Sequence, residues 1–405
     1  MKNLLKVALG VVTGIGGFLD AGTIATCAQA GALFGFRLLW VVALGTLCII
    51  CLSEMVGRLA AVSHHTLAGA IRERFGIRYH AIPIVAEVFL DVIVLSAEIG
   101  GVAIALQLLT GVGFPWWSVP VAAGAWLLLW RGTFDVVEDG VALLGLVTLC
   151  FAVAAYKTHP PLREMLTGLL PSLPPQKPAQ YWFIAVSMMG SLICPYVLNF
   201  YSSGAVEEEW TEADLGANRM AAGLGMSFGG GLSAALLVAA AMVLHPKGID
   251  GNTYEEIRLT VSIPLGQTGA TLFAVALGVT CFGAALQVAL NLSYTLAQAF
   301  GWNWSENLEP ADDARFATTY TIAILVAAIV VAIGFDPLKV TMLAMAFNAV
   351  VAPLLVLPLL ILMNDQDYLG AHTNGWFSNT VVAFCTLLAF VMGIVAIPLQ
   401  FMGGT

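Results

Sequence analysis

Long apolar runs recur along the whole sequence, and they decide what the chain can fold into. Short polar connections separate them, and charged residues make up only 10% of the chain. In lipid, only helices and closed barrels satisfy every backbone N–H and C=O group. The runs are long enough for membrane helices and lack the alternation of barrel strands. The sequence therefore predicts an all-α integral membrane protein whose first partner is the lipid bilayer.

We predict about 11 membrane helices, which would form one transmembrane domain over residues 1–405. The basic start of the first run resembles a signal peptide, but its apolar pattern continues to about residue 33, so we interpret it as a membrane helix. Lysine and arginine positions favour a cytoplasmic N-terminus. The predicted spans are 5–33, 36–60, 79–109, 115–131, 138–156, 181–206, 215–245, 264–300, 314–334, 338–363 and 379–399.

Two of these spans are interrupted in a similar way. The first contains Gly-Phe-Leu-Asp-Ala-Gly at 17–22, and the sixth contains SLICPYVLN at 191–199. Pro195 in the sixth span cannot donate a backbone hydrogen bond. Interruptions at matching positions of two halves indicate an inverted repeat with a binding site near the bilayer midplane. We expect a first repeat at 1–156, a second at 181–363 and an extra helix at 379–399.

Asp20 is an acid inside the first interruption, where an unpaired carboxylate costs about 2.5–3.5 kcal/mol on insertion scales. A bound cation, protonation in a proton relay, or a helix-capping role would each account for it. Cys194 precedes Pro195 at the second interruption and would add a soft ligand that favours transition metals. The other cysteines are interpreted as free buried thiols.

Further polar groups lie in the predicted helices. Asp91 and Glu98 are two turns apart in the third span, so both face one side of that helix and suit either a proton or ion path or a buried hydrogen-bonding role. Asn348, Gln287 and Asn291 are better interpreted as polar contacts between helices.

Several function classes are disfavoured by the residues. The net charge of −9 and the lack of a basic tract give no support for nucleic-acid binding. Hydrolase, nucleotide-binding and zinc-protease motifs are not found in the sequence, so we predict that the protein is not an enzyme and needs no cofactor. Without a nucleotide fold, transport would be driven by an ion gradient.

Three segments carry a resemblance to a known family. The run DAGTIATCAQAGALFGFRLLWVVALGTLCIICLSEMVGRLAAVS at 20–63 resembles the first two helices of the Nramp family of divalent-metal transporters. AEIGGVAIALQLL at 97–109 is similar to the third Nramp helix, and MMGSLICPYVLNFYSS at 188–203 takes the place of its Met-Pro-His helix. The resemblance implies a LeuT-like fold of five plus five helices, with helices 1 and 6 broken.

The resemblance implies a metal site, with departures from the family pattern. Asp20 matches the metal-binding aspartate, Thr23 stands for asparagine and Ala21 for proline, while Cys194 replaces the metal-binding methionine. Ser191 would offer a backbone carbonyl.

Other matched positions concern protons and the rest of the site. Tyr196 replaces the histidine linked with proton movement, and Leu95 stands where the family has a proton-pathway aspartate, whereas Glu98 matches a glutamate of the third helix. Met345 aligns near the metal-facing glutamine, and Asn348 follows one turn later. Asp91 completes the candidates for a proton or ion path.

We therefore expect a monomeric transporter in a bacterial inner membrane that moves a divalent cation by alternating access. Mn²⁺ and Fe²⁺ are the first candidates and Mg²⁺ is an alternative, because Mg²⁺-transporting relatives also depart from the usual site. Protons are possible co-substrates, although the replaced histidine and aspartate put ordinary proton coupling in doubt. The rival hypotheses are an amino-acid or amine transporter of the same fold, and a relative that senses metal without transporting it.

Overall fold

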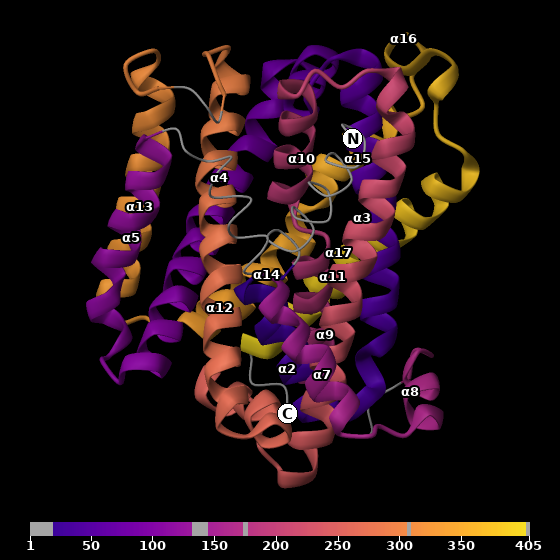
Figure 1. The fold of residues 1–405 in the computed structure, drawn as a ribbon. Helices are drawn as coiled ribbons and strands as arrows, with labels where there is room; N and C mark the ends of the chain where they lie inside the picture. The colour runs from indigo at the N-terminus through magenta and orange to yellow at the C-terminus, as the bar shows by residue number, and fades with distance from the viewer. Residues whose placement is uncertain (1–18, 132–144, 173–176, 306–308, 402–405) are drawn as a thin grey trace.

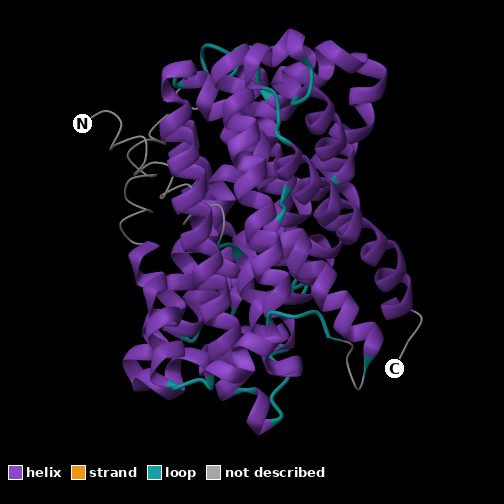
Figure 2. Cartoon of the chain, turned by 90° about the vertical axis from the view of Figure 1, so that its right-hand side faces the viewer, coloured by secondary structure: helices purple, strands orange, loops and turns teal. Residues whose placement is uncertain are grey.

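The computed structural model describes residues 19–131, 145–172, 177–305 and 309–401, and in this part of the chain all regular structure is helical (Figures 1 and 2). The first helices are α2 (Ala21–Phe34), η1 (Gly35–Leu38), α3 (Leu39–Ser63), α4 (Leu67–Thr110) and α5 (Phe114–Trp130). They are followed by η2 (Leu146–Thr148), α7 (Leu149–Lys157), α8 (Leu162–Gly168), α9 (Pro178–Leu192), α10 (Pro195–Glu207) and η3 (Glu212–Asp214).

The remaining elements form the second half of the bundle (Figure 1). They are α11 (Leu215–Val243), η4 (His245–Lys247), α12 (Tyr254–Phe300), α13 (Ala314–Ala332), α14 (Pro337–Val351), α15 (Pro353–Leu362), α16 (Gln366–Leu369), η5 (Gly370–His372) and α17 (Trp376–Phe401). Over the described residues, 8 helical stretches are long and apolar enough to cross a membrane. The prediction of an all-α membrane protein is confirmed.

The predicted spans map onto these elements with three kinds of difference. The first and second spans form one continuous apolar stretch, Ala21–Ser63, and the tenth is divided into α14 and α15. The start of the first span, with the first two residues of its interruption, lies outside the described residues, as does the start of the fifth. The Pro-rich connection 159–180 contains the short helix α8, which packs against η1 and α3 rather than forming a domain.

Two helices begin earlier than hydropathy predicts, and both bend at a glycine. α4 starts at Leu67 instead of residue 79, and α12 starts at Tyr254 instead of 264. Gly76 in α4 has φ of 79° and Gly266 in α12 has φ of 69°, a conformation that glycine adopts without steric cost. The polar arms before these bends were missed because they are charged. Since they precede the third and eighth spans, they occupy corresponding places five spans apart.

Close helix packing brings the broken helices against α14. α9 packs on α14, α2 packs on α11, and α4 packs along α12. At Gly190 of α9, an added Cβ would lie 1.8 Å from the carbonyl oxygen of Met345, so only glycine permits this approach. The two backbones therefore meet beside the second helix break, which places Met345 of α14 near both broken helices.

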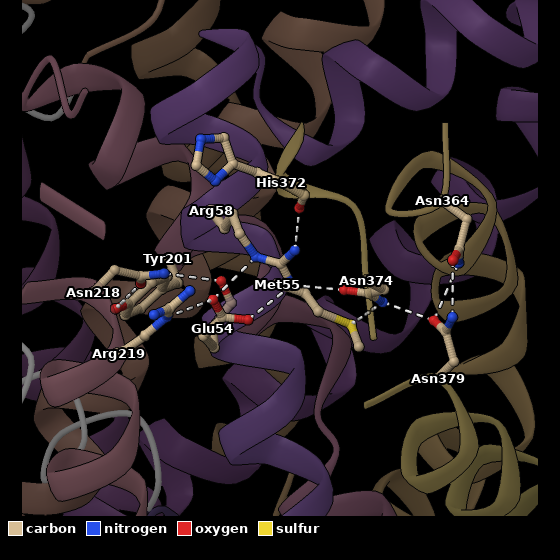
Figure 3. A network of polar contacts seen from close by, with 10 residues as sticks. All are labelled: Glu54, Met55, Arg58, Tyr201, Asn218, Arg219, Asn364, His372, Asn374 and Asn379. Atoms are coloured by element: carbon tan, nitrogen blue, oxygen red, sulfur yellow. Dashed lines mark hydrogen bonds and ion pairs between the residues drawn. The ribbon is translucent and has the colours of Figure 1, made fainter. Parts of the chain in front are cut away.

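A polar network fastens the end of α3 to its neighbours (Figure 3). The guanidinium of Arg58 donates two hydrogen bonds to the carboxylate of Glu54, each 3.0 Å long. It also donates to the carbonyl of His372 and to Oδ1 of Asn374 in the segment before α17. Asn218 of α11 donates to the Glu54 carbonyl over 2.9 Å. Here a buried arginine neutralises a carboxylate and joins α3, α11 and the C-terminal segment.

Candidate metal site at two helix breaks

Asp20 lies immediately before α2 and caps it. Its Oδ1 accepts a hydrogen bond of 2.7 Å from the backbone N–H of Thr23, which is the geometry of a helix N-cap. Its Oδ2 is buried and has no hydrogen-bond partner, and the side chain as a whole is only 1% exposed. Capping therefore accounts for one oxygen of this carboxylate and leaves the other available to a ligand.

The second break lies between α9, which ends at Leu192, and α10, which begins at Pro195. A helical carbonyl normally accepts from the N–H four residues later, and for Ser191 that residue is Pro195, which has none. The Ser191 carbonyl therefore has no helical N–H donor, because proline occupies the position four residues later. Cys194 sits at the break and is 2% exposed.

Helix α14 contributes residues to a third side of the site formed by the two breaks. The Sδ atom of Met345 lies 2.5 Å from the position that a Cβ on Gly22 would occupy, so this thioether covers the first turn of α2. The amide nitrogen of Asn348 lies 3.1 Å from Sγ of Cys194 and 3.7 Å from Sδ of Met345. Asn348 thus joins the two sulfur atoms. We call Asp20, Cys194, Met345 and Asn348, with the Ser191 carbonyl, the break site.

Thr23 and Ser191 occupy the ends of the two broken helices. Thr23 is buried in the first turn of α2, and its backbone N–H donates to Asp20. The Ser191 hydroxyl donates to the Met188 carbonyl over 3.0 Å and lies 3.3 Å from the hydroxyl of Thr26 in α2. The last contact holds α2 and α9 together, so the predicted ligand residues of both breaks are neighbours in the structure.

Glu98 of α4 contacts the first break through a backbone group. Both of its carboxylate oxygens accept from the N–H of Ala21, at 3.2 and 3.1 Å, and the side chain is fully buried. A proline at this position would have no N–H to give. The alanine that departs from the family pattern therefore provides the link between Glu98 and the residue next to Asp20.

The other predicted path residues, Tyr196 and Asp91, lie on α10 and α4. Tyr196 is buried in the first turn of α10. Asp91 shares its hydrogen-bond donor, Asn291, with Glu87, a buried acid that sequence reasoning missed. Its spacing of one helical turn from Asp91 inside an apolar span was the signal that could have revealed it.

The break site combines one carboxylate oxygen, one freed carbonyl and two sulfur atoms. Carboxylate and carbonyl oxygens accept many divalent cations, whereas thiolate and thioether sulfur favour transition metals over Mg²⁺ and Ca²⁺. No grouping of three or more His, Cys, Asp and Glu side chains suited to a metal occurs among the described residues. The arrangement offers a cation both oxygen and sulfur ligands.

The sequence model of the family described as natural resistance-associated macrophage protein-like, Nramp, matches residues 10–398. The chain belongs to the Nramp family. This membership makes it a membrane transporter rather than an enzyme, and it bears out the resemblance found in the sequence. A relative from Bradyrhizobium diazoefficiens, named divalent metal cation transporter MntH, is 28% identical over 95% of this Nramp chain and 86% of its own length.

Solved structures agree with this Nramp assignment at the level of fold. The manganese transporter of Eremococcus coleocola superposes with a TM-score of 0.80 at 20% identity, covering 100% of this chain and 88% of the other. A nucleobase-cation-symport-1 family transporter superposes with a TM-score of 0.65 at 15% identity, covering 97% and 92%. The predicted LeuT-like architecture is confirmed, while the exact repeat boundaries stay a prediction.

Proposed function

We propose that this Nramp protein moves divalent metal cations across the membrane by alternating access, with Mn²⁺ and Fe²⁺ as its first substrates. The observation that carries the proposal is the buried, unpartnered Oδ2 of Asp20. A carboxylate oxygen at membrane depth is costly unless something binds it. A cation held between Asp20, the Ser191 carbonyl and the two sulfur atoms supplies the missing partner.

The sulfur atoms support the choice of metal. Sγ of Cys194 and Sδ of Met345 are joined by the same Asn348 amide, so both lie on one side of the break site. A soft ligand pair adds affinity for Mn²⁺, Fe²⁺ or Cd²⁺ and little for Mg²⁺. Mg²⁺ is accordingly the weaker candidate. The names of the MntH relatives and of the Eremococcus coleocola manganese transporter point to the same class of substrate.

The way the site is built supports alternating access. Its ligands come from α2, the α9–α10 break and α14, which are separate elements that can rotate relative to one another. In transporters of this architecture, one bundle rocks around a fixed central site. Glu98 is the proposed proton-carrying group, since its carboxylate accepts a hydrogen bond from the Ala21 N–H next to Asp20 and is therefore in direct contact with the first break.

The amino-acid alternative fits the geometry less well. A substrate carboxylate would need the N-terminal end of a half-helix, but Asp20 already caps α2 with its own carboxylate. Two negative groups at one helix end repel each other. A cation has no such conflict, and the break site offers it both charge and lone pairs.

The test is uptake of Mn²⁺ into liposomes by the purified protein and its Asp20→Asn variant. We expect a loss of at least about 100-fold in uptake, because removing a direct ligand exceeds the 10–100-fold effect of outer contacts. The matched control is Asp336→Asn. Asp336 also caps a helix, accepting from Leu338 N over 3.1 Å, but lies outside the break site.

The control separates metal binding from capping. If Asp20 only caps α2, transport persists in both variants, because asparagine caps helices about as well as aspartate. If Asp20 binds the metal, only its variant loses Mn²⁺ uptake and Mn²⁺ binding in titration calorimetry. Unchanged Mn²⁺ binding by Asp20→Asn would rule out the proposal.

A further inference from the structure

A second group of buried polar residues lies where α4, α10 and α12 meet. It consists of Glu87 and Asp91 of α4, Asn199 of α10 and Asn291 of α12, which we call the acidic cluster. All four side chains are buried, with exposed fractions of 3%, 3%, 2% and 0% in that order. Two carboxylates and two amides therefore share a site closed to solvent.

Amide donors connect the two carboxylates. Nδ2 of Asn291 donates to Oε1 of Glu87 over 3.1 Å and to Oδ2 of Asp91 over 2.8 Å. Nδ2 of Asn199 donates to the same Glu87 oxygen over 2.5 Å. One nitrogen thus serves both acids, which places the carboxylates next to each other on a single turn of α4.

The charge of the acidic cluster is not balanced by the protein. In the described part of the chain, no Lys, Arg or His side chain forms an ion pair with Glu87 or Asp91; the pairs to carboxylates there involve other acids, such as Glu54 with Arg58. Two adjacent buried carboxylates cannot both stay ionised without a counter-charge. Either a proton or a cation must therefore accompany them.

The amide oxygens are available to a cation. Oδ1 of Asn199 and Oδ1 of Asn291 are both buried without a hydrogen-bond partner. Each amide directs its nitrogen, not its oxygen, toward the carboxylates. Because an asparagine amide can turn to offer its oxygen instead, a cation between the carboxylates would gain both oxygens as ligands and give them a partner. Four side chains would then present oxygen ligands to one ion.

We propose that the acidic cluster is a second cation site, which binds a hard divalent cation such as Mg²⁺, Ca²⁺ or Mn²⁺ through oxygen atoms alone. Two carboxylates match the charge of a divalent ion, and carboxylate plus amide oxygens are the ligands that such ions prefer. Asn199 lies on the first turns of α10, which begins directly after Cys194. The acidic cluster would thus be the next binding site for an ion that leaves the break site. This role rests on the proposed function, whereas cation binding at the acidic cluster does not.

The experiment measures equilibrium binding of radioactive Mn²⁺ to the purified full-length protein, with Mg²⁺ or Cd²⁺ as competitor. The wild type is expected to bind two Mn²⁺ ions, one displaced by Mg²⁺ from the oxygen-only site and one displaced by Cd²⁺ from the sulfur-containing break site. The double variant Glu87→Gln, Asp91→Asn is expected to lose the Mg²⁺-displaceable ion. Its remaining Cd²⁺-displaceable ion shows that it is folded.

A second variant adds charge instead of removing it. Asn291→Asp is expected to raise Mg²⁺ affinity at the acidic cluster about tenfold, because affinity rises with the number of charged ligands. If the asparagine is only a hydrogen-bond donor, the variant gains no Mg²⁺ affinity. That result, or a double variant that keeps its Mg²⁺-displaceable ion, would overturn the second site.

The two proposals fail separately. Loss of the second site while Asp20→Asn still abolishes the Cd²⁺-displaceable ion leaves the proposed function intact. Conversely, a protein whose Mn²⁺ binding depends on Glu87 and Asp91 but not on Asp20 would keep the second site and contradict the break site.

Discussion

The break site and the acidic cluster both hold buried carboxylate in the same bundle, but they surround it with different atoms. The break site places Asp20 in a set with two sulfur atoms and a carbonyl released by Pro195, whereas Glu87 and Asp91 contact amide groups and the Thr295 hydroxyl. The first set suits a borderline or soft ion and the second a hard one. The two sites are therefore expected to differ in which metal ions they prefer, and the sulfur-containing break site is expected to discriminate between transition metals and Mg²⁺.

A third carboxylate shows what an acid does here when it has a purely structural role. Glu54 is bound by both arms of the Arg58 guanidinium, and the pair is continued by Asn374 and Asn218 (Figure 3). Its charge is balanced within the protein. The contrast with Glu87 and Asp91 is what makes the missing counter-charge of the acidic cluster informative.

Of the substitutions that distinguish the two sites, Cys194→Ser is expected to change metal competition the most. Cys194→Ser exchanges the sulfur for oxygen, so Cd²⁺ should compete with Mn²⁺ uptake about 10–100-fold less well while Mg²⁺ competes better. Cys194→Met, which retains sulfur, should keep the wild-type order. Competition curves in liposome uptake measure both. Equal Cd²⁺ inhibition of the serine variant and the wild type would show that the thiol is not a ligand.

Ala21→Pro is expected to have the next largest effect. Proline is well tolerated at the first position of a helix, so α2 itself should form. The variant removes the backbone N–H that both oxygens of the buried Glu98 carboxylate accept from, which should cost about 1–3 kcal/mol in stability. Thermal unfolding in detergent measures the loss. Ala21→Gly retains the N–H and serves as the control; an equal loss in both variants would contradict the role assigned to this hydrogen bond.

Arg58→Lys tests the structural carboxylate. Lysine cannot reproduce the two-armed contact with Glu54 and the further bonds to His372 and Asn374. We expect about 1–2 kcal/mol lower stability with unchanged Mn²⁺ and Mg²⁺ binding stoichiometry. Calorimetric titration beside thermal unfolding checks this. A change in the number of bound ions would mean that the network of Figure 3 belongs to the cation path.

The smallest effect is expected at Asp313, an acid outside the membrane helices. Its hydrogen bonds with the Arg315 side chain hold its pKa at about 2. A lowered pKa in the folded state contributes stability above the unfolded value of about 3.9, and that stability is lost as pH falls toward about 2. Asp313→Asn should therefore lower the unfolding temperature by the same small amount at pH 8 and pH 6. A difference between those two pH values would contradict the assignment.

Much of the fold was predictable because lipid leaves the backbone few choices. The apolar runs predicted the membrane helices, and Pro195 predicted the second break, since it removes one N–H from a helix that has no water to replace it. The early starts of α4 and α12 were not predictable from hydropathy, because the arms before Gly76 and Gly266 contain charged residues and the helices bend at these glycines.

The candidate site was predictable only in part. Asp20 and Cys194 were identified from their positions at the two interruptions, and the Nramp resemblance added Met345. The roles of Glu87 and Asn199 were not visible, because each is an isolated polar residue in an apolar span until α4, α10 and α12 pack together.

The sequence by itself determined the helical membrane fold, the two breaks and the acid at the first of them, because these depend on local chemistry along the chain. Only the tertiary structure decided which groups meet. In the folded protein, the Asn348 amide contacts the sulfur atoms of both Cys194 and Met345. The Glu98 carboxylate accepts a hydrogen bond from the Ala21 N–H. One asparagine, Asn291, donates to both Glu87 and Asp91. Such contacts join residues far apart in the chain, and no periodicity of a single helix encodes its neighbour.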